Sequence, residues 1–447
     1  MTPTLNLLPD STPLANQVAG HQNVLSDASG SLVIKVCAAL SNSFHPTPPA
    51  LPREIAFYQL VNSSPRSSLI ARLRPFLAQF YGTLRLEGQL ASDGVIDRDA
   101  IQKRDVAESV VLENLAHAYT RPSILDVKLG TVMYAPDASV EKRAKMEAKM
   151  REGTSLETGM RLTGCQTWHA PTRSYILTPK SFGKSLLPSQ LPLGIIRFFP
   201  LPSDAIPSLA LPFTPPASTA VTSPNFTLVA THLPLPSSLT SPHTPRTPTP
   251  SQTYTDHALP AHSILKVLKI LDEQISRLSS VVESLEMRFI GSSVLIVYEG
   301  DETRLASALE RYDTQAQIAS LNHHTLTSPK NLADYDSDDE DDGDDDDDDH
   351  GTYSGESSTS SDDDEDDGSR KDARRARRCP PVSLRLIDFA HTRLAEGEGP
   401  DEGVLLGLKT LTGLVNRRRQ EVIASVLFKG KEWRDGGPTK SDGETHG

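Results

Sequence analysis

Short apolar runs bounded by glycine, proline or polar turn residues predict β-strands along this chain. Four of them lie at residues 30–36, 109–115, 291–300 and 384–387, and each is rich in Val, Ile or Leu. A fifth, at residues 122–130, begins with a proline and stops at a glycine. This fifth strand is unusual because its apolar residues alternate with two residues of opposite charge.

Elsewhere the apolar residues recur at helical spacing. The clearest helix covers residues 262–289, with Ser263 as its N-cap and a glycine just past its end. We expect it to pack on a sheet and assign it no chemistry. A second helix is predicted to begin within residues 52–58, with Glu54 in its first turn. A third is predicted at residues 402–415, where two glycines allow close packing.

Asp126 and Lys128 are the charged pair on the strand at residues 122–130. Side chains at i and i+2 of a strand point to the same face, so the two groups project together. A carboxylate that can hold a metal or a hydroxyl, beside a cation that can meet phosphate oxygens, is the pairing that phosphoryl transfer needs. The alternative is a surface ion pair on an edge strand.

A second apolar strand, at residues 384–387, ends in Asp388 followed by Phe389. An Asp-Phe pair after a strand is similar to the magnesium site of protein kinases, in which the aspartate ligates the metal that bridges the β- and γ-phosphates. His391 follows three residues after Asp388 and is a candidate donor beside the phosphates. The alternative for His391 is a hydrogen-bonded structural histidine.

Four motifs together resemble the signatures of the inositol polyphosphate kinase family, in the family's order. Residues 122–130 read Pro-x-x-x-Asp-x-Lys-x-Gly, residues 292–295 read Ser-Ser followed by apolar residues, and residues 387–391 read Ile-Asp-Phe-Ala-His. Residues 17–21 (Gln-Val-Ala-Gly-His) resemble the amino-terminal signature of the family's multikinase branch. The resemblance extends from about residue 14 to residue 415.

The resemblance implies an α+β, two-lobed kinase fold, of the ATP-grasp or protein-kinase-like type found in inositol phosphate kinases, with two disordered insertions. It implies transfer of the ATP γ-phosphoryl group to hydroxyls of inositol tris- and tetrakisphosphates, with ATP and Mg²⁺ as cofactors. The alternative within the family is a hexakisphosphate kinase that makes pyrophosphates. Ala19 favours the multikinase branch, since hexakisphosphate kinases more often have glycine there.

The resemblance also assigns the ATP site. Lys35, on the strand at residues 30–36, matches the lysine that neutralises the ATP phosphates, and Glu54 matches the helix glutamate that orients it. The Glu113 carbonyl and the Leu115 amide would meet the adenine edge at the hinge. The family usually has aspartate where this chain has Asn114, which leaves recognition through the backbone unaffected.

The resemblance assigns the chemistry to residues at the two strand ends. Asp126 would bind the ribose of the nucleotide or orient the substrate, Lys128 would stabilise the charge of the transferred phosphate, and Asp388 would hold Mg²⁺. A general base stays unassigned, with Asp126 as the candidate, because deprotonation of an alcohol can come late in a loose transition state.

Residues 137–151 predict a helix capped by Ser139, and its Lys142, Lys145 and Lys149 share one helical face. Such a stripe suits a substrate crowded with phosphates, because each lysine acts as a point charge for phosphate. The resemblance places this helix at the inositol phosphate, with Lys128 and His391 as further contacts. The alternative is a solvated face with Glu-Lys pairs.

The chain has 447 residues, 34 prolines and a net charge of −13, to which an acidic tract at residues 336–367 contributes strongly. Its like charges should keep it extended. The basic block at residues 370–378 favours nuclear import, with a linker that folds back on the acidic run as the alternative. These features also support a non-catalytic nuclear scaffold that binds basic partners, although Lys35, Asp126, Lys128 and Asp388 are all in place.

We therefore expect a monomer that is present in the nucleus and the cytoplasm and that uses inositol polyphosphates as substrates. Residues 323–381 are expected to bind nuclear import factors or basic proteins. No apolar run reaches the length of a membrane span, the first residues lack a signal peptide's basic region, and three scattered cysteines fit a reducing compartment. The predicted divisions are a disordered 1–13, an N-lobe at 14–115, C-lobe parts at 116–199, 259–322 and 382–430, disordered insertions at 200–258 and 323–381, and a disordered tail at 431–447.

Overall fold

The computed structural model describes residues 12–14, 17–18, 24–37, 53–85, 89–90, 96–97, 108–135, 138–170, 172–201, 204, 259–326 and 379–435. Most of the predicted insertions and tail, the acidic tract, the basic block and residues 19–21 of the amino-terminal motif lie outside these residues. The predictions made for them therefore stay predictions.

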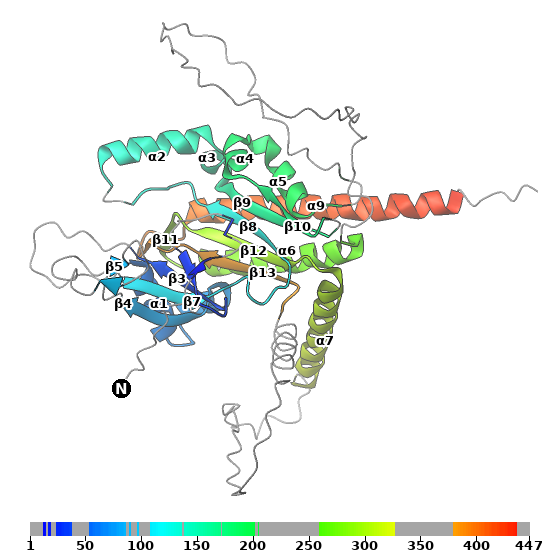
Figure 1. The fold of residues 1–447 in the computed structure, drawn as a ribbon, viewed down its shortest axis with the longest axis horizontal. Coiled ribbons are helices and arrows are strands. Elements are labelled where there is room, and N and C mark those ends of the chain that lie inside the picture. The colour runs from blue at the N-terminus through cyan, green and yellow to red at the C-terminus, as the bar shows by residue number, and fades with distance from the viewer. Residues whose placement is uncertain are drawn as a thin grey trace, which may run out of the picture.

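The described residues form a mixed set of strands and helices, coloured in chain order in Figure 1. The strands are β1 (Thr12–Pro13), β2 (Val24–Ser26), β3 (Leu32–Val36), β4 (Phe80–Arg85), β5 (Gln89–Leu90), β6 (Ile96–Asp97), β7 (Glu108–Glu113), β8 (Pro122–Leu129), β9 (Met160–His169), β10 (Ser174–Thr178), β11 (Met287–Ile290), β12 (Ser293–Glu299), β13 (Val382–Ile387) and β14 (His391–Leu394). The helices are α1 (Arg53–Ser63), η1 (Ile70–Phe76), α2 (Val140–Glu152), α3 (Ser155–Thr158), α4 (Lys180–Ser185), η3 (Pro188–Gln190), α5 (Leu191–Phe198), α6 (Ala261–Glu283), α7 (Glu302–Leu326) and α9 (Glu402–Asp435).

The first lobe is built on an antiparallel sheet with the strand order β1-β2-β3-β7-β4. Helix α1 belongs to this lobe and buries Ile55, Phe57, Tyr58 and Val61. Strand β3 is central, and its Leu32 pairs with Glu113 at the end of β7 that leads to the second lobe. The strand expected at residues 30–36 and the helix expected from residue 52 are therefore both present.

The second lobe is built on a sheet with the order β10-β9-β8-β12-β13, again antiparallel. Strand β8, which carries Asp126 and Lys128, lies between β9 and β12. The alternative for Asp126 and Lys128, an ion pair on an edge strand, is therefore excluded, because β8 has a neighbouring strand on each side. Two sheets with helices packed on them make an α+β, two-lobed fold, as expected.

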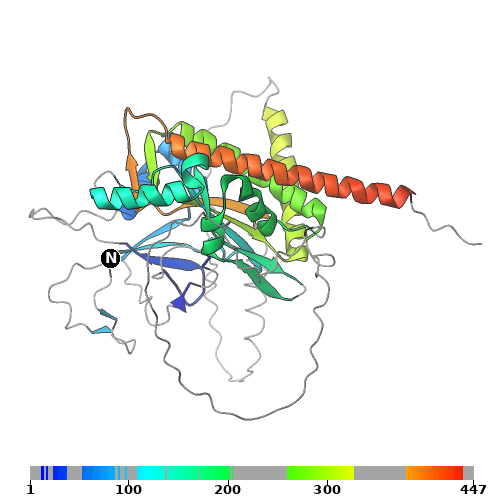
Figure 2. The same cartoon turned by 90° about the horizontal axis from the view of Figure 1, so that it is seen from above.

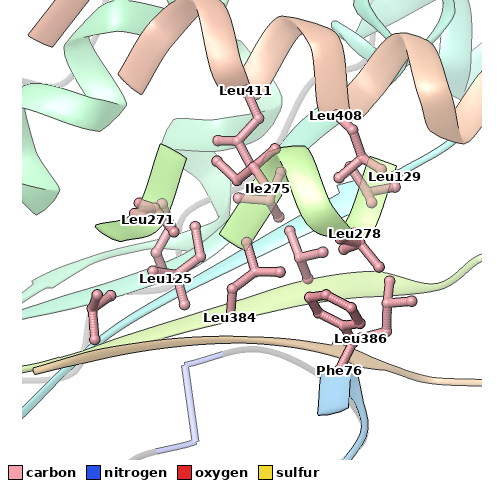
Figure 3. Packing of buried hydrophobic residues seen from close by; sticks show 14 of the residues in the cluster. Phe76, Leu125, Leu129, Leu271, Ile275, Leu278, Leu384, Leu386, Leu408 and Leu411 are labelled. Carbon is pink, nitrogen blue, oxygen red and sulfur yellow. The ribbon is translucent and has the colours of Figure 1, made fainter. Parts of the chain in front are cut away.

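The main core lies where α6 and α9 cover the second sheet. Leu271, Ile275 and Leu278 of α6 point toward Leu125 and Leu384 of the sheet, while Leu408 and Leu411 of α9 close the cluster from outside (Figure 3). Figure 2 shows α9 running along one side of the molecule. Among the described residues, no helix is long and apolar enough to cross a membrane.

The predicted end of the long helix was wrong. Helix α6 ends at Glu283, and Phe289 lies in β11, where it pairs with Thr392 of β14. The N–H of Phe289 donates to Asp401 at 2.9 Å, so tertiary hydrogen bonds replace the helical ones. The predicted N-cap was also wrong: the N-cap residue is Pro260, and Ser263 lies in the first turn of the helix.

Several predicted boundaries also need correction. Helix α7 continues to Leu326, into the second predicted insertion, and α9 continues to Asp435, into the predicted tail. At the start of the first predicted insertion, Leu201 is buried and Asp204 forms an ion pair with the buried Arg418 of α9. The short strand β1 lies at the end of the amino-terminal segment that was expected to be disordered.

Two glycines let α9 pack closely against the loops that flank the second sheet. A Cβ atom on Gly407 would lie well inside van der Waals contact with the Gly159 carbonyl oxygen, and one on Gly403 would collide with Thr131. The Gly130 N–H donates to the same Gly159 carbonyl at 2.7 Å. Helix α9 thus presses on the turn after β8 and on the turn before β9.

We expect Gly407→Ala to lower the free energy of unfolding by about 1–3 kcal/mol, the usual cost of overpacking, because a backbone carbonyl cannot move aside cheaply. Gly413→Ala in the same helix is the matched control, since its Cβ would meet nothing within 4 Å. It should stabilise by up to ~1 kcal/mol through helix propensity. Urea unfolding of both variants measures the difference, and equal effects would contradict the packing argument.

Candidate active site

Lys35 joins the two lobes through a pair of carboxylates. Its Nζ lies 2.9 Å from Glu54 Oε1 on α1 and 2.6 Å from Asp388 Oδ1, just past β13 of the second lobe. Burial alone would lower the pKa of Lys35, but Asp388 and Glu54 hold that pKa above its ordinary value. The lysine is therefore a fixed cation, and the structure brings together three of the residues predicted for the ATP site.

Asp388 adopts an uncommon backbone conformation with φ of 66°, which for a non-glycine residue occurs mainly with Asp, Asn and His. The Ser292 hydroxyl donates to its carbonyl oxygen at 2.9 Å. The next residue, Phe389, is fully buried and stacks on Phe57 of α1 at 4.1 Å between ring centroids. Strain at Asp388 is thus offset by neighbours that fix both sides of it.

Asp126 is 4% exposed and is supported by a bulge in the neighbouring strand. The register between β8 and β9 shifts at this point, which leaves Thr163 unpaired and free to donate its hydroxyl to Asp126 Oδ1 at 2.7 Å. Burial raises the pKa of Asp126, the Thr163 hydrogen bond opposes this rise, and the nearby Asp388 adds to it. A buried carboxyl with a raised pKa is typical of functional sites.

Lys128 lies in a row of residues that crosses the sheet. It pairs with Arg161 of β9 on one side and with Ser293 of β12 on the other, and Ser293 in turn pairs with Ile387, the residue before Asp388. Directly paired residues share a face of an antiparallel sheet. Arg161, Lys128 and the Asp388 turn therefore lie along one line.

Arg161 was missed by the sequence reasoning. It is largely buried, burial lowers its pKa, and its Nε has no hydrogen-bond partner among the described residues. The only sequence signal was an arginine in a strand-like run after Gly159, and its significance depends on the register between β8 and β9. The structure thus adds a second cation beside Lys128.

The hinge between the lobes follows β7. The Asn114 side chain donates from Nδ2 to the Gly30 carbonyl at 2.7 Å and accepts from the Ala116 N–H at 3.1 Å. Its backbone N–H donates to Ser31. An aspartate could not make the bond to Gly30, so the amide fastens the hinge to the turn between β2 and β3. Glu113 and Leu115, predicted to meet the adenine edge, lie on either side of Asn114.

The remaining predicted residues lie on α2 and at the start of β14. Lys142, Lys145 and Lys149 are exposed on α2, whose N-cap is Ser139 as predicted. His391 begins β14 and pairs with Ile290. The structure therefore places a cationic helix after β8 and a histidine after the Asp388 turn.

A divalent cation fits the acidic groups, although the described residues contain no cluster of three His, Cys, Asp or Glu side chains. Mg²⁺ is usually held by one or two carboxylates together with substrate phosphates and water. Asp388 interacts electrostatically with Asp126 and faces Lys35. Asp388, with Asp126 beside it, could hold such an ion, and Lys35, Lys128 and Arg161 could neutralise phosphate groups around it.

The family model for inositol polyphosphate kinase matches residues 109–209 and 251–416. The match covers more than half of the chain and includes Asp126, Lys128 and Asp388. The fold and the site define a two-lobed protein of kinase type. The chain belongs to the inositol polyphosphate kinase family.

The chain is 26% identical over 184 residues to the inositol polyphosphate multikinase of Schizosaccharomyces pombe, which covers 41% of this chain and 61% of that protein. It is 23% identical over 331 residues to the human inositol hexakisphosphate kinase 1, covering 72% and 55%. A crystal structure of an inositol phosphate multikinase from S. cerevisiae with ADP and Mn²⁺ is 19% identical, covers 87% of this chain and 98% of that chain, and gives a TM-score of 0.46. The chain spans about three fifths or less of the length of these two curated relatives.

We expect Asp126→Asn to stabilise the fold at neutral pH. Because the folded-state pKa of Asp126 is raised, its ionisation costs the folded state free energy above that pKa, whereas below the ordinary value of about 3.9 the acid is protonated in both states. Asn keeps an oxygen that accepts from Thr163. Urea unfolding from pH 4 to 8 should show an advantage for the variant that grows with pH, and a constant difference would contradict this cause.

Proposed function

We propose that this protein transfers the γ-phosphoryl group of ATP to hydroxyls of inositol tris- and tetrakisphosphates. The observation that carries the proposal is the meeting of two groups of residues. Lys35, Glu54 and Asp388 form one ion cluster at 2.6 and 2.9 Å, and Lys128 lies two strands from Ile387, the residue before Asp388. Phosphoryl transfer depends mainly on positioning and on neutralising phosphate charge, which this arrangement supplies.

On the nucleotide side, the Glu113 carbonyl and the Leu115 amide would receive the adenine edge, and Asp126 would accept a ribose hydroxyl or orient the substrate. Lys35 would hold the phosphates while Glu54 keeps it oriented. Asp388 would hold Mg²⁺, which when bound neutralises the charge that develops on the phosphate oxygens. The hydrogen bond from Lys35 to the Asp388 carboxylate would keep that carboxylate oriented toward the phosphates that Lys35 holds.

On the acceptor side, Lys128 and Arg161 would meet the transferred phosphate and a substrate phosphate. Lys142, Lys145 and Lys149 of α2 would add three charges for the other phosphates, and His391 would add a donor. This abundance of cations on one side of the transfer point supports an acceptor that carries several phosphates. It does not decide how many.

A hexakisphosphate kinase remains the second candidate, because one similar relative has that activity in its name. A non-catalytic scaffold is the candidate of another class. The intact ion cluster favours catalysis over it, since three buried or half-buried charges are costly to keep without a use. Two predictions stay predictions: localisation in nucleus and cytoplasm, and partners for residues 323–381. Most of residues 323–381 lie outside the part of the chain that the structure describes.

Purified protein with ATP and Mg²⁺ should phosphorylate inositol tris- and tetrakisphosphates, with products separated by anion-exchange chromatography. Asp388→Asn should lose most of this turnover while keeping the parental melting temperature, because it removes a charge rather than a core contact. Turnover on inositol hexakisphosphate alone would favour the second candidate. No turnover on any of these inositol phosphates would contradict the proposed kinase activity and would favour the non-catalytic scaffold.

Changing Lys142, Lys145 and Lys149 together to Gln should raise the KM for the inositol phosphate by at least about tenfold and leave the KM for ATP nearly unchanged. The exposed lysines act through charge that is screened over roughly 8 to 10 Å at physiological ionic strength. The variant should therefore show a shallower salt dependence than the parent. Equal changes in both KM values would indicate a folding defect, and no change would indicate a solvated face.

A further inference from the structure

Helix α2 carries three of the proposed substrate contacts but has few attachments of its own. Of its thirteen residues only Met150, near its C-terminal end, is buried. In both views the helix extends from the body of the molecule (Figures 1 and 2). A helix of this length is marginal in isolation, so its position depends on whatever tethers it to the rest of the chain.

One side chain of the preceding segment supplies such a tether. The Tyr134 hydroxyl donates to Glu147 Oε1, just past the middle of α2, at 2.9 Å. The guanidinium of Arg143 lies 5.9 Å from the centre of the Tyr134 ring, one helical turn before Glu147. The Glu147 carboxylate raises the pKa of the Tyr134 hydroxyl, chiefly through this hydrogen bond.

Tyr134 is itself well placed to be a fixed point. It follows β8 by five residues, and its neighbours Met133 and Ala135 are both buried, with 8% and 5% exposure. The main chain at Tyr134 is therefore anchored by a buried residue on each side. A group bound to its hydroxyl, such as Glu147, is thereby tied to an anchored segment of the main chain.

The tether and the lysines use different faces of α2. Arg143, Glu147 and Met150 recur at i, i+4 and i+7 and form the attached face, whereas Lys142, Lys145 and Lys149 form a neighbouring face that is exposed. Fixing the first face also fixes the direction of the second. A rotation of the helix about its axis would carry all three charges away together.

We propose that the Tyr134–Glu147 hydrogen bond is a latch that positions the lysine face of α2 for a polyphosphorylated acceptor. The inference rests on the proposed function and makes Tyr134 and Glu147 positioning residues that need not touch the substrate. The latch sets affinity for the acceptor and leaves the nucleotide site alone. It also explains why a helix with one buried residue keeps a defined orientation.

Tyr134→Phe should raise the KM for an inositol tetrakisphosphate about three- to tenfold, the effect expected from the loss of one ordinary, partly exposed hydrogen bond. The kcat and the KM for ATP should stay within about twofold. Tyr81→Phe is the matched control. The Tyr81 hydroxyl also makes a side-chain hydrogen bond, to Gln79, but Tyr81 lies on β4, in the first lobe. In the triple lysine-to-glutamine background, Tyr134→Phe should have no further effect, since no lysine face is left to position.

Glu147→Gln and Glu147→Ala separate the hydrogen bond from the charge. Both remove the carboxylate and its ion pair with Arg151, but Gln keeps an oxygen that accepts from the Tyr134 hydroxyl. The latch predicts a lower KM for the acceptor in Glu147→Gln than in Glu147→Ala. Equal KM values in the two variants would overturn it.

Trypsin cleavage tests the latch without any turnover, since α2 offers cleavage sites after its three lysines. Mass spectrometry should show faster cleavage there in Tyr134→Phe than in the parent or in Tyr81→Phe, because local opening exposes the backbone. An active parent with unchanged KM and unchanged cleavage in Tyr134→Phe would overturn the latch alone. A parent with no turnover on any inositol phosphate would overturn the proposed function and the latch's role in substrate binding.

Discussion

The ion pairs of Lys35 are the interaction on which the arrangement of the two lobes depends. Lys35 comes from the first sheet, Glu54 from α1 and Asp388 from the end of the second sheet, so three separate elements meet at one ammonium group. One ammonium group can serve two carboxylates only while both stay within hydrogen-bonding distance of it. Removing Lys35 would leave two carboxylates without a cation, which costs far more than the ion pairs contribute.

Apolar packing supports the same junction from behind. Phe389 stacks on Phe57 and meets Tyr58 edge-on, and the Phe389 N–H points to Glu54 Oε1 at 3.5 Å. The aromatic contacts are short-ranged and need close registration of α1 against the Asp388 turn. The position of α1 is thus coupled to the conformation of Asp388, and a shift of either one would disturb the metal and phosphate groups proposed there.

Local patterns, together with the family resemblance that they carry, predicted much of this site. A lysine in an apolar strand, an early glutamate in a helix and an aspartate at a strand end are features of single segments. The resemblance assigned Lys35, Glu54 and Asp388 to one ATP site, and the structure brings the three side chains together. Arg161 and Thr163 could not be found in this way, because their positions depend on the register and bulge between β8 and β9. The end of α6 was missed for a similar reason, since its apolar spacing continues into β11, whose hydrogen bonds come from β14 and Asp401.

The two ends of the second lobe's site are held in different ways. Asp126 is buried, the half-buried Asp388 is bonded to Lys35 and Ser292, and α9 presses on the turn after β8 through glycines that leave no room for a side chain. Helix α2 begins only eleven residues beyond the end of β8 yet relies on one buried methionine and a few polar contacts. Rigid placement suits the groups at the reacting phosphate, where small displacements are costly. A lightly tethered helix suits charges that act over several ångströms, as proposed for the three lysines of α2 and the phosphorylated acceptor. On that proposal, acceptor preference could change while the groups at the reacting phosphate stay fixed.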